Sequence, residues 1–307
     1  MSGKCHKTMP ANKTVMWNLI ADTVRGAAHG RTGLPNQDAF RLMPEGGSGK
    51  SVVVAVSDGH GSSECFRSDI GAKFAVDAAV AALSPLLQPS EGVSHSTLKH
   101  LVEQQLPRDI VRSWRAQVWQ HLKDNPVSSP QTDKAGTGPS NPNETNPYLA
   151  YGATLMAVLV TNLYLVYLQL GDGDIVAVSE DGEVLRPIPR DDRLMGNMTT
   201  SLCMEEAARE MRVRFQTADS GLPAMILVST DGYSNSFVDD GSFLKAGPDM
   251  LRAILDNGLD SVSKMLSTWL SEASQLGSGD DTTVAVLLRS GLGPSGGRVS
   301  PGSEESA

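Results

Sequence analysis

Acidic residues stand at the ends of several strand-like segments of this sequence. Asp58 directly follows the β-branched run SVVVAVS, and Asp231 directly follows AMILVST. Asp280 and Asp281 precede the run TTVAVLL, and Asp38 precedes a short segment at 39–43. Three of these runs are apolar enough to be central strands, so their ends are expected to converge in space. The four acidic positions are therefore candidates for one shared site.

Converging carboxylates need a compensating charge. Two unit charges about 4 Å apart repel by roughly 4 kcal/mol at an effective dielectric near 20. Ionised groups held this close require shifted pKa values or bound cations. Oxygen ligands suit Mg²⁺ or Mn²⁺, whereas the absence of a Cys and His cluster disfavours zinc. Two such ions bridged by a carboxylate activate a water and stabilise phosphoryl oxygens, so the pattern favours phosphate-ester hydrolysis.

The segment Asp58-Gly59-His60-Gly61 adds two kinds of chemistry to these carboxylates. The glycines let the backbone approach a metal closely, and the Gly59 carbonyl is then available as a ligand. His60 has an ordinary pKa of about 6.5, which suits it to protonate a leaving alkoxide. The alternative is that these residues have no catalytic or metal-binding role, because most loop histidines are structural or solvated and Asp-Gly after a strand usually forms a turn.

Asp-Gly pairs also occur at Asp172, Asp181 and Asp240. We interpret Asp181 and Asp240 as turn residues, because Asp-Gly is a strong turn signal and nothing else marks these two positions. Asp172 lies between two apolar runs and gains weight only from the family resemblance described below.

Alternation, β-branched content and turn signals predict the elements that position these residues. Strands are expected at 17–23, 39–43, 51–57, 153–161, 163–170, 175–179, 183–188, 211–217, 224–230 and 283–288. Helices are expected at 65–83, 97–122 with a kink at Pro107, 204–210, 248–257 and 259–273. Because the strands are often linked as hairpins and the helices come in groups, the pattern indicates an α+β fold with antiparallel sheets.

One domain is expected over residues 16–289. Residues 1–15 are interpreted as a flexible leader, and the Gly-, Pro- and Ser-rich residues 290–307 as a disordered tail. Residues 123–149 are rich in Pro, Asn, Ser, Thr and Gly, so they bury little and are expected to form a flexible insert.

Composition narrows the class of protein. The 307 residues include 26 basic and 35 acidic side chains, a net charge of −9, which argues against a nucleic-acid partner. Three cysteines, at 5, 65 and 203, form neither a disulfide framework nor a zinc motif and indicate a reducing cytoplasm. The N-terminus lacks a secretory pattern, and the apolar runs are too short to span a bilayer. We therefore expect a cytoplasmic monomer that binds no membrane.

Six segments in order resemble the metal-dependent protein phosphatases, the PPM family of type 2C serine/threonine phosphatases. These segments are NQDAF (36–40), VVVAVSDGHGSSE (52–64), YGATLMAVLV (151–160), LGDGDIVAV (170–178), ILVSTDGYSN (226–235) and GDDTTVAVLL (279–288). The resemblance covers nearly the whole domain. It implies two stacked antiparallel β-sheets flanked by helices on both outer faces, and hydrolysis of phosphoserine and phosphothreonine by a metal-bridging water.

The resemblance also implies roles for single residues. The implied metal ligands are Asp58, which bridges two Mn²⁺ or Mg²⁺ ions, the Gly59 carbonyl, Asp231, Asp280, and Asp172 at a weaker third ion. Asp38 is implied to act through metal-bound water, and His60 as the general acid. The implied partner is a phosphorylated protein, the target of a Ser/Thr kinase.

The sequence departs from the family pattern on the phosphate-binding side. Gln37 stands where the family usually has Glu, and a neutral amide holds a metal-bound water with less charge. The family's phosphate-binding Arg lies five residues before the Asp that matches Asp38, where this chain has Gly33. Arg31 is the best substitute, with Arg25 as the alternative.

Two further departures lie at strand ends, where the usual Gly-Asp-Ser-Arg is Gly171-Asp172-Gly173-Asp174 and the usual terminal Asp-Asn is Asp280-Asp281. These variations resemble a bacterial signalling subgroup of the family. Residues 190–210 occupy the place of its variable flap beside the active site.

Three functions remain open on the sequence alone. The first is an active Mn²⁺- or Mg²⁺-dependent protein phosphatase, which the presence of Asp58, Asp231 and Asp280 favours. The second is a non-catalytic phosphatase-like regulatory module, suggested by Gln37 and by the missing Arg at position 33. The third is a metal-dependent hydrolase of a small phosphorylated molecule.

Overall fold

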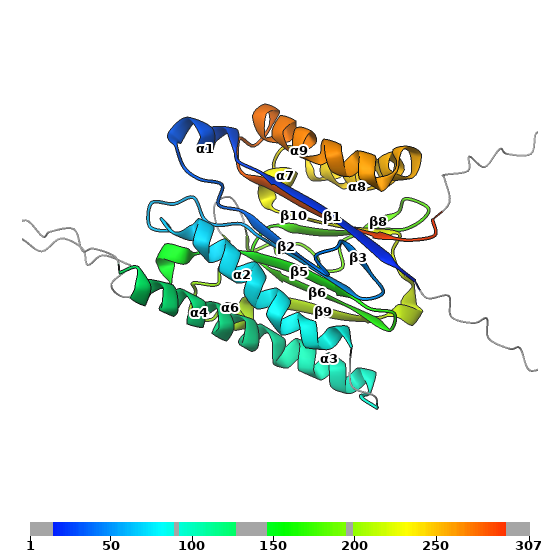
Figure 1. Ribbon diagram of the computed structural model, residues 1–307, viewed down its shortest axis with the longest axis horizontal. Helices are drawn as coiled ribbons and strands as arrows, with labels where there is room; N and C mark the ends of the chain where they lie inside the picture. Colours follow the sequence, from blue (N-terminus) through cyan, green and yellow to red (C-terminus); the bar gives the residue numbers. More distant parts are fainter. Residues whose placement is uncertain (1–14, 89–91, 127–145, 195–198, 293–307) are drawn as a thin grey trace, which may run out of the picture.

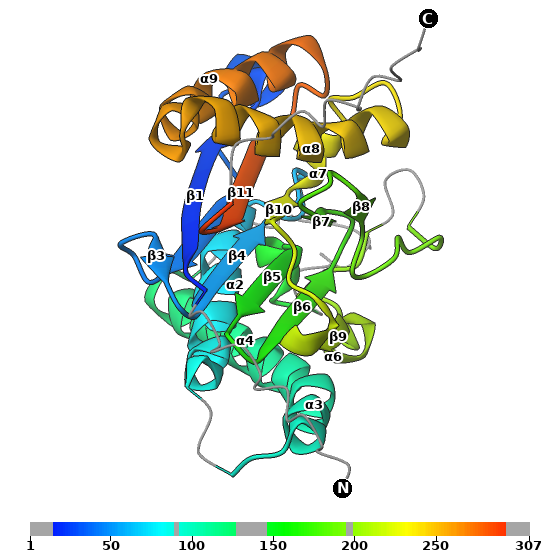
Figure 2. The same cartoon turned by 90° about the vertical axis from the view of Figure 1, so that its right-hand side faces the viewer.

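The computed structural model describes residues 15–88, 92–126, 146–194 and 199–292. Two antiparallel β-sheets stack face to face, and helices cover the outer face of each sheet (Figure 1). Figure 2 shows the resulting layers from the side, with helix, sheet, sheet and helix in turn. The α+β sandwich expected from the sequence is therefore confirmed.

The first sheet has six strands in the order β3-β1-β11-β10-β7-β8. Their bounds are β3 Ser48–Gly49, β1 Trp17–Val24, β11 Thr282–Arg289, β10 Met225–Ser229, β7 Asp174–Val178 and β8 Val184–Leu185. β11 is the central strand that pairs with both β1 and β10, and it is buried from Thr282 to Leu288. The predicted strand at 183–188 shrinks to the two residues of β8.

The second sheet has five strands in the order β2-β4-β5-β6-β9. Their bounds are β2 Ala39–Met43, β4 Val52–Ser57, β5 Leu155–Val160, β6 Tyr164–Leu170 and β9 Arg212–Thr217. β4 is buried at every position because its two faces meet different layers. Val53 and Ala55 pack toward the helices, while Val54 and Val56 pack between the sheets. Burial on both faces explains the uninterrupted apolar run.

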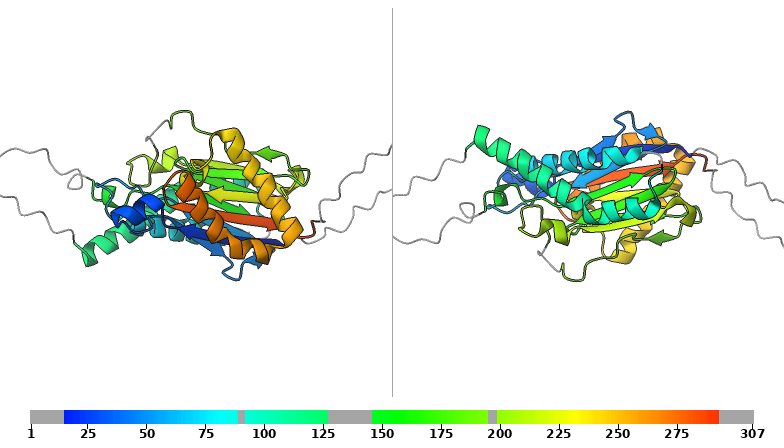
Figure 3. Two further views of the ribbon diagram at one scale, coloured as in Figure 1. Left: turned by 90° about the horizontal axis from the view of Figure 1, so that it is seen from above. Right: turned by 90° about the horizontal axis from the view of Figure 1, so that it is seen from below.

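Helices α2 (Ser68–Leu83), α3 (His95–Gln104) and α4 (Leu106–Asp124) cover the five-stranded sheet, as the view from below in Figure 3 shows. The sequence predicted one kinked helix over 97–122, but the structure has two. The break falls at Gln105, and Pro107 lies in the first turn of α4, where its missing N–H leaves no hydrogen bond unmade.

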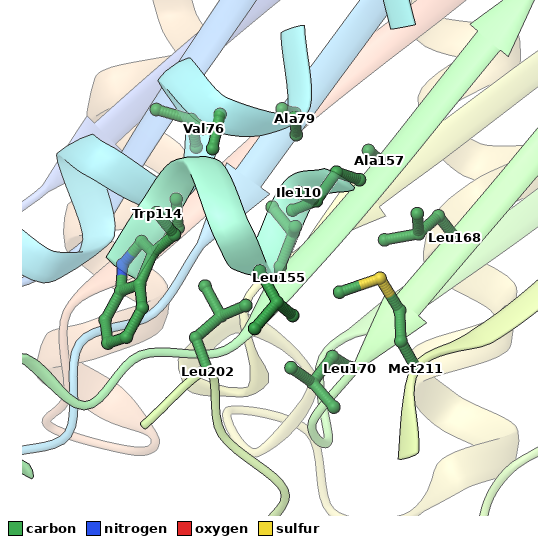
Figure 4. Packing of buried hydrophobic residues seen from close by; sticks show 14 of the residues in the cluster. Val76, Ala79, Ile110, Trp114, Leu155, Ala157, Leu168, Leu170, Leu202 and Met211 are labelled. Carbon is green, nitrogen blue, oxygen red and sulfur yellow. The ribbon is translucent and has the colours of Figure 1, made fainter. Parts of the chain in front are cut away.

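Figure 4 shows how α2 and α4 pack on the sheet, with Val76 and Ile110 facing Leu155 and Ala157 of β5. Trp114 is fully buried, and its indole Nε1 donates a 2.9 Å hydrogen bond to the carbonyl of Gly71. The segment Ser68–Leu87, which includes α2 and the 3₁₀ turn η1 (Ser84–Leu87), is long and apolar enough to cross a membrane by composition alone. Its packing on the sheet accounts for that apolar character.

Helices α8 (Asp240–Asn257) and α9 (Leu259–Leu276) cover the six-stranded sheet, as the view from above in Figure 3 shows. The turn predicted at Asp240-Gly241 is wrong, because these two residues begin α8. Asp239 explains the early start, because its carboxylate accepts a 2.7 Å hydrogen bond from the Ser242 N–H and caps the helix. Pro248, the expected start of this helix, lies inside it.

The remaining elements are short. They are α1 (Ala27–Thr32), the 3₁₀ turn η2 (Leu149–Tyr151), α6 (Ala207–Glu210), the 3₁₀ turn η3 (Ala218–Ser220) and α7 (Asp231–Ser234). Only α6 was expected from the sequence, as part of the helix predicted at 204–210.

The predicted leader, insert and tail fall mostly on residues 1–14, 127–145 and 293–307, which lie outside the described residues. Their flexibility stays a prediction. The described edges of the insert belong to ordered elements, since α4 extends to Asp124 and η2 begins at Leu149.

Candidate metal centre

A cavity of about 780 Å³ lies at the strand ends that carry Asp58, Asp231 and Asp280. Helices α1 and α7 lie at this end of the sandwich (Figure 1). Six of the predicted site residues line it, namely Asp58, Gly59, His60, Asp172, Asp231 and Asp280. These residues are far apart in the sequence and come from both sheets. The expected convergence of strand ends therefore occurs in the structure.

Asp58 leaves the five-stranded sheet at the end of β4 and is held there by Thr154, which precedes β5. The Asp58 N–H donates a 3.0 Å hydrogen bond to Thr154 Oγ1, and the Thr154 N–H returns a 2.8 Å bond to the Asp58 carbonyl. Ser57 Oγ also donates to the Thr154 carbonyl at 2.6 Å. Because its backbone is fixed on both sides, the Asp58 carboxylate has a defined position at the cavity wall.

Gly59 occupies a position that admits no side chain. A Cβ there would lie 2.6 Å from the carbonyl oxygen of Ser68 and 2.7 Å from that of Gln37, and both are backbone atoms. The Gly59 N–H donates to the same Gln37 carbonyl at 3.1 Å. Because Gly59 has no side chain, the turn after β4 can pass between the backbone segments of Ser68 and Gln37 and still line the cavity.

Three carboxylates reach the cavity from loops associated with the six-stranded sheet. Asp231 begins α7 directly after β10, and Asn235 Nδ2 donates a 2.9 Å hydrogen bond to its Oδ2. Asp280 precedes β11 and leaves half of its side chain exposed. Asp172 lies in the turn between β6 and β7, where Thr199 Oγ1 donates to its Oδ1 at 2.9 Å.

Asp38 lies deeper, next to Asp58, and is almost fully buried. Its Oδ2 accepts hydrogen bonds from two strand-end hydroxyls, Thr230 Oγ1 at 2.8 Å and Thr283 Oγ1 at 2.7 Å. Its Oδ1 is buried without a hydrogen-bond partner among the described residues. A buried carboxylate oxygen left without a partner is costly, so it marks a place where a donor or a cation belongs.

Burial and mutual repulsion shift the pKa values of these carboxyl groups upward. Burial is the main cause for each, and it raises the pKa of Asp38 to about 8 and that of Asp231 to about 7. The pKa of Asp58 rises well above its ordinary value through burial and then through the charges of four other aspartates, Asp38, Asp231, Asp280 and Asp172. These carboxylates can all be ionised at once without strong mutual repulsion only if bound cations offset their charge.

The residues present therefore fit a site for hard divalent cations. Five carboxylates and the backbone carbonyl of Gly59 offer oxygen ligands, which are the ligands that Mn²⁺ and Mg²⁺ take in proteins. The partnerless Oδ1 of Asp38 points to the same conclusion.

His60 lines the same cavity, and its backbone N–H donates a 3.1 Å hydrogen bond to the Gly152 carbonyl. A Cβ at Gly152 would lie 2.7 Å from the His60 ring, so the ring is packed against that backbone. Burial lowers the pKa of His60, and the nearby Asp172 charge opposes that shift. At pH 7 the imidazole is therefore mostly neutral before an anion binds.

The two arginines predicted for the phosphate lie away from this arrangement. Arg31 is an exposed residue of α1 and is not among the residues that line the cavity. Arg25 is also exposed, and its Nη2 donates a 2.9 Å hydrogen bond to the His29 carbonyl. A role of either arginine in phosphate binding stays a prediction, and this geometry does not support it.

Asp174 and Asp281, the two aspartates that depart from the family motifs, are both buried and held by contacts with other parts of the fold. Asp174 is buried and pairs with Arg186 at 2.7 Å and with Arg190 at 3.4 Å, outside the cavity. Asp281 is also buried, and its two oxygens accept 2.6 Å hydrogen bonds from the backbone N–H groups of Gly26 and Gln37. These bonds fasten the segment before β2 to the start of β11.

Sequence reasoning missed three kinds of residue at this site. Thr230 and Thr283, which bind Asp38, look like ordinary strand residues because threonine is common in sheets. Asp281 was grouped with Asp280 at a strand end and noted as a departure from a family motif, but it was given no role of its own. His29 lines the cavity from α1, and its Nδ1 lies 3.0 Å from Asp281 Oδ2. Its one visible signal is a histidine placed among glycines and alanines shortly before Asp38.

Comparisons with known proteins identify a family and a shared fold. The profile of the family described as "Protein phosphatase 2C" matches residues 25–271. Comparison with curated proteins by sequence finds no significant match. Solved structures that resemble the fold include bacterial phosphatases at 12–19% identity, a level at which the likeness concerns the fold.

Three of these structures show how much of each chain is shared. The catalytic domain of the serine threonine protein phosphatase PstP in complex with two manganese ions has 19% identity and a TM-score of 0.51, covering 90% of this chain and 99% of that one. PppA, a key regulatory component of the type VI secretion system in Pseudomonas aeruginosa, has 16% identity and a TM-score of 0.55, covering 89% and 97%. Serine/threonine phosphatase Stp1 from Staphylococcus aureus has 12% identity and a TM-score of 0.53, covering 95% and 100%.

Proposed function

Because the chain belongs to the protein phosphatase 2C family, we propose that it is a metal-dependent serine/threonine protein phosphatase. One observation carries the proposal: Asp58 of one sheet and Asp231 and Asp280 of the other line a single cavity, with Asp38 buried behind them. Five aspartates at one cavity repel one another, and bound cations would remove that repulsion, so the cluster supports a metal-binding function.

In this proposal Asp58, the Gly59 carbonyl, Asp231 and Asp280 hold two Mn²⁺ or Mg²⁺ ions, with Asp172 at a third. When bound, the ions supply a strongly acidified water and offset the charge of the phosphoryl oxygens. Asp38 contributes through its free Oδ1, which faces no donor in the described part of the chain. Thr230 and Thr283 keep that carboxylate in place through its other oxygen.

His60 is the proposed proton donor to the leaving serine or threonine oxygen. It lines the cavity beside Asp58, so a substrate phosphate in the cavity lies within reach of its ring. The bound phosphate dianion favours the protonated imidazole and so opposes the effect of burial on its pKa. The proton is then held where the alkoxide forms.

The test is turnover of a phosphothreonine peptide by the purified full-length chain, measured with Mn²⁺, with Mg²⁺ and with a chelator. Metal-dependent release of phosphate is expected. A folded protein that binds Mn²⁺ and phosphopeptide but releases no phosphate would instead support the non-catalytic regulatory module. Turnover restricted to small phosphorylated molecules would support the third function, a small-molecule phosphatase.

A further inference from the structure

A second, smaller cavity of about 200 Å³ adjoins the metal centre. Asp172, Asp231 and Asn235 line both cavities, so the two share a wall. Among the described residues, Arg190 and Arg212 line the smaller cavity, whereas neither Arg nor Lys lines the larger one. A molecule that places a phosphate in the larger cavity can therefore reach an arginine with a neighbouring group.

The register of the five-stranded sheet fixes the direction of Arg212. Arg212 begins β9 and lies opposite Gln169 of β6, and cross-strand partners project from the same face of a sheet. Val213 and Phe215, at alternate positions, pack against the helices, so Arg212 projects from the other face, toward the six-stranded sheet. Asp172 follows three residues after Gln169, which places the Arg212 side chain beside the turn that carries this proposed ligand.

The carboxylates near Arg212 are engaged by another arginine. Asp191 also lines the smaller cavity, and its Oδ1 accepts hydrogen bonds from the Arg193 N–H at 3.1 Å and from Arg193 Nε at 2.9 Å. Nη2 of the same arginine lies 2.7 Å from Asp191 Oδ2 and 2.8 Å from Glu210 Oε2. The charge of Asp191 is therefore already matched and leaves Arg212 without a partner.

Arg212 is a half-buried cation with no carboxylate within 4 Å among the described residues. Its Nη1 donates a hydrogen bond to the Pro189 carbonyl, the one side-chain hydrogen bond that it makes within the described part of the chain. Burial lowers the pKa of this guanidinium, because it is partly removed from water. Arg190 differs, since it lies 3.4 Å from Asp174 and 3.2 Å from Asp240. The smaller cavity thus offers one guanidinium with free donors to an anion.

We propose that Arg212 binds an acidic side chain of the substrate and so selects phosphopeptides with an aspartate or glutamate close to the phosphorylated residue. A guanidinium presents paired N–H donors that match the two oxygens of a carboxylate. Because the two cavities share a wall and an extended chain rises about 3.3 Å per residue, the acidic side chain lies within about three residues of the phosphate. The inference rests on the proposed function for its substrate class.

Two other roles for Arg212 predict different behaviour. If Arg212 contacted the phosphoryl group that is hydrolysed, its loss would slow every phosphate substrate by the same factor. If Arg212 only held the Pro189 carbonyl, its loss would lower the melting temperature without changing the choice between peptides.

The experiment compares two phosphothreonine peptides on the Mn²⁺-loaded full-length protein. One carries Glu and the other Gln at the three positions on each side of the phosphothreonine. We measure kcat/KM for both peptides and for p-nitrophenyl phosphate in wild type, Arg212→Ala and Arg212→Lys. Arg214→Ala is the matched control, because Arg214 lies on the same face of β9, is exposed and does not line the cavity. Thermal melts establish that each variant is folded.

We expect wild type to prefer the Glu peptide by about 10-fold in kcat/KM, the lower end for a charge-assisted hydrogen bond because Arg212 is partly exposed. Arg212→Ala should lose most of this preference, through a fall for the Glu peptide that the Gln peptide and p-nitrophenyl phosphate do not share. Arg212→Lys should keep part of the preference, and Arg214→Ala should match wild type. A preference that persists in Arg212→Ala, or an equal loss for all three substrates, would overturn the inference.

Binding of phosphonate analogues, in which a CH₂ group replaces the bridging oxygen of the phosphothreonine, separates this inference from the proposed function. Their affinities are measured by fluorescence anisotropy, which does not require turnover. A wild type that hydrolyses both peptides equally well refutes the acidic subsite and leaves the phosphatase in place. If wild type hydrolyses neither peptide but binds the Glu analogue about 10-fold more tightly through Arg212, the proposed function fails while the subsite stands. Failure to bind either analogue refutes the subsite.

Discussion

The carboxyl groups of Asp58 and Asp231 lie within hydrogen-bonding reach of each other across the seam between the two sheets. Asp58 ends β4 of the five-stranded sheet, and Asp231 follows β10 of the six-stranded sheet. Burial raises the pKa of both groups; the charge of Asp231 adds to the rise for Asp58, whereas a hydrogen bond with Asp58 opposes the rise for Asp231. The seam therefore carries a local electrostatic cost that a cation would remove.

Replacing Asp58 by Asn should separate folding from activity. The amide removes one charge from the cluster, so the chelator-treated variant should be as stable as wild type or more stable. Metal-dependent turnover should fall by about 1000-fold or more, since several kcal/mol of transition-state stabilisation are lost. Asp181→Asn, at an exposed turn, is the matched control in thermal melts and phosphatase assays. Full activity in Asp58→Asn would exclude this residue as a bridging ligand.

Stability of the chelator-treated protein should decrease as pH rises from about 5 to about 8. The folded state raises the pKa of Asp231 to about 7 and that of Asp38 to about 8, above the ordinary value of 3.8. The native state thus binds protons that the unfolded chain releases, and each such proton costs up to about 1.4 kcal/mol per pH unit as it is lost. Melting temperatures across this range test the slope.

The variant Asp38→Asn provides the comparison for that pH series. It removes one of the carboxyl groups with a raised pKa, so its melting temperature should fall less steeply between pH 5 and 8 than that of wild type. Saturating Mn²⁺ should flatten the wild-type curve, because cations replace the protons. A chelator-treated wild type that gains stability toward pH 8 would contradict the carboxylate assignment.

Mn²⁺ should stabilise the folded protein, because it binds carboxylates that come together only in that state. At a concentration of about 100 times Kd the gain is about 2.7 kcal/mol, which corresponds to a rise in Tm of about 5 °C or more. Differential scanning calorimetry with and without Mn²⁺ measures the shift. Asp181→Asn should show the full rise and Asp58→Asn little of it; equal shifts in both would place the ions elsewhere.

Replacement of His60 by Gln should slow the enzyme in a way that depends on the leaving group. A serine alkoxide is a strong base that needs a proton, so kcat for a phosphoserine peptide should fall about 100-fold or more. The p-nitrophenolate ion is a far weaker base and leaves without one, so kcat for p-nitrophenyl phosphate should change much less. Equal losses for both substrates would assign His60 a role other than proton donation.

The strand ends around Asp58, Asp231 and Asp280 were predictable because each carboxylate adjoins a strand that is buried on both faces and reads as a continuous apolar run. The stacking of the two sheets followed from the family resemblance and is confirmed. The start of α8 was missed because Asp239 caps a helix at a place where Asp-Gly usually indicates a turn.

The phosphate-binding side was not predictable by counting residues. The family pattern places a cation five residues before the Asp that matches Asp38, which assumes a direct path between the two. In this chain α1 lies in that path, so the residue that faces the cavity, His29, is nine positions before Asp38. The length of an intervening loop is set by tertiary contacts, here those of Gly26 and Gln37 with Asp281, which local sequence does not reveal.

The carboxylate of Asp281 holds both ends of the segment from Gly26 to Gln37, because one oxygen accepts a hydrogen bond from the Gly26 N–H and the other from the Gln37 N–H. The anchor points are therefore independent of what lies between them, and an insertion or deletion there need not move Asp38 or β2. These two hydrogen bonds make the segment a natural site for divergence between relatives. New recognition residues could also be grafted into this segment, since the chain between Gly26 and Gln37 can be exchanged while the carboxylate cluster stays intact.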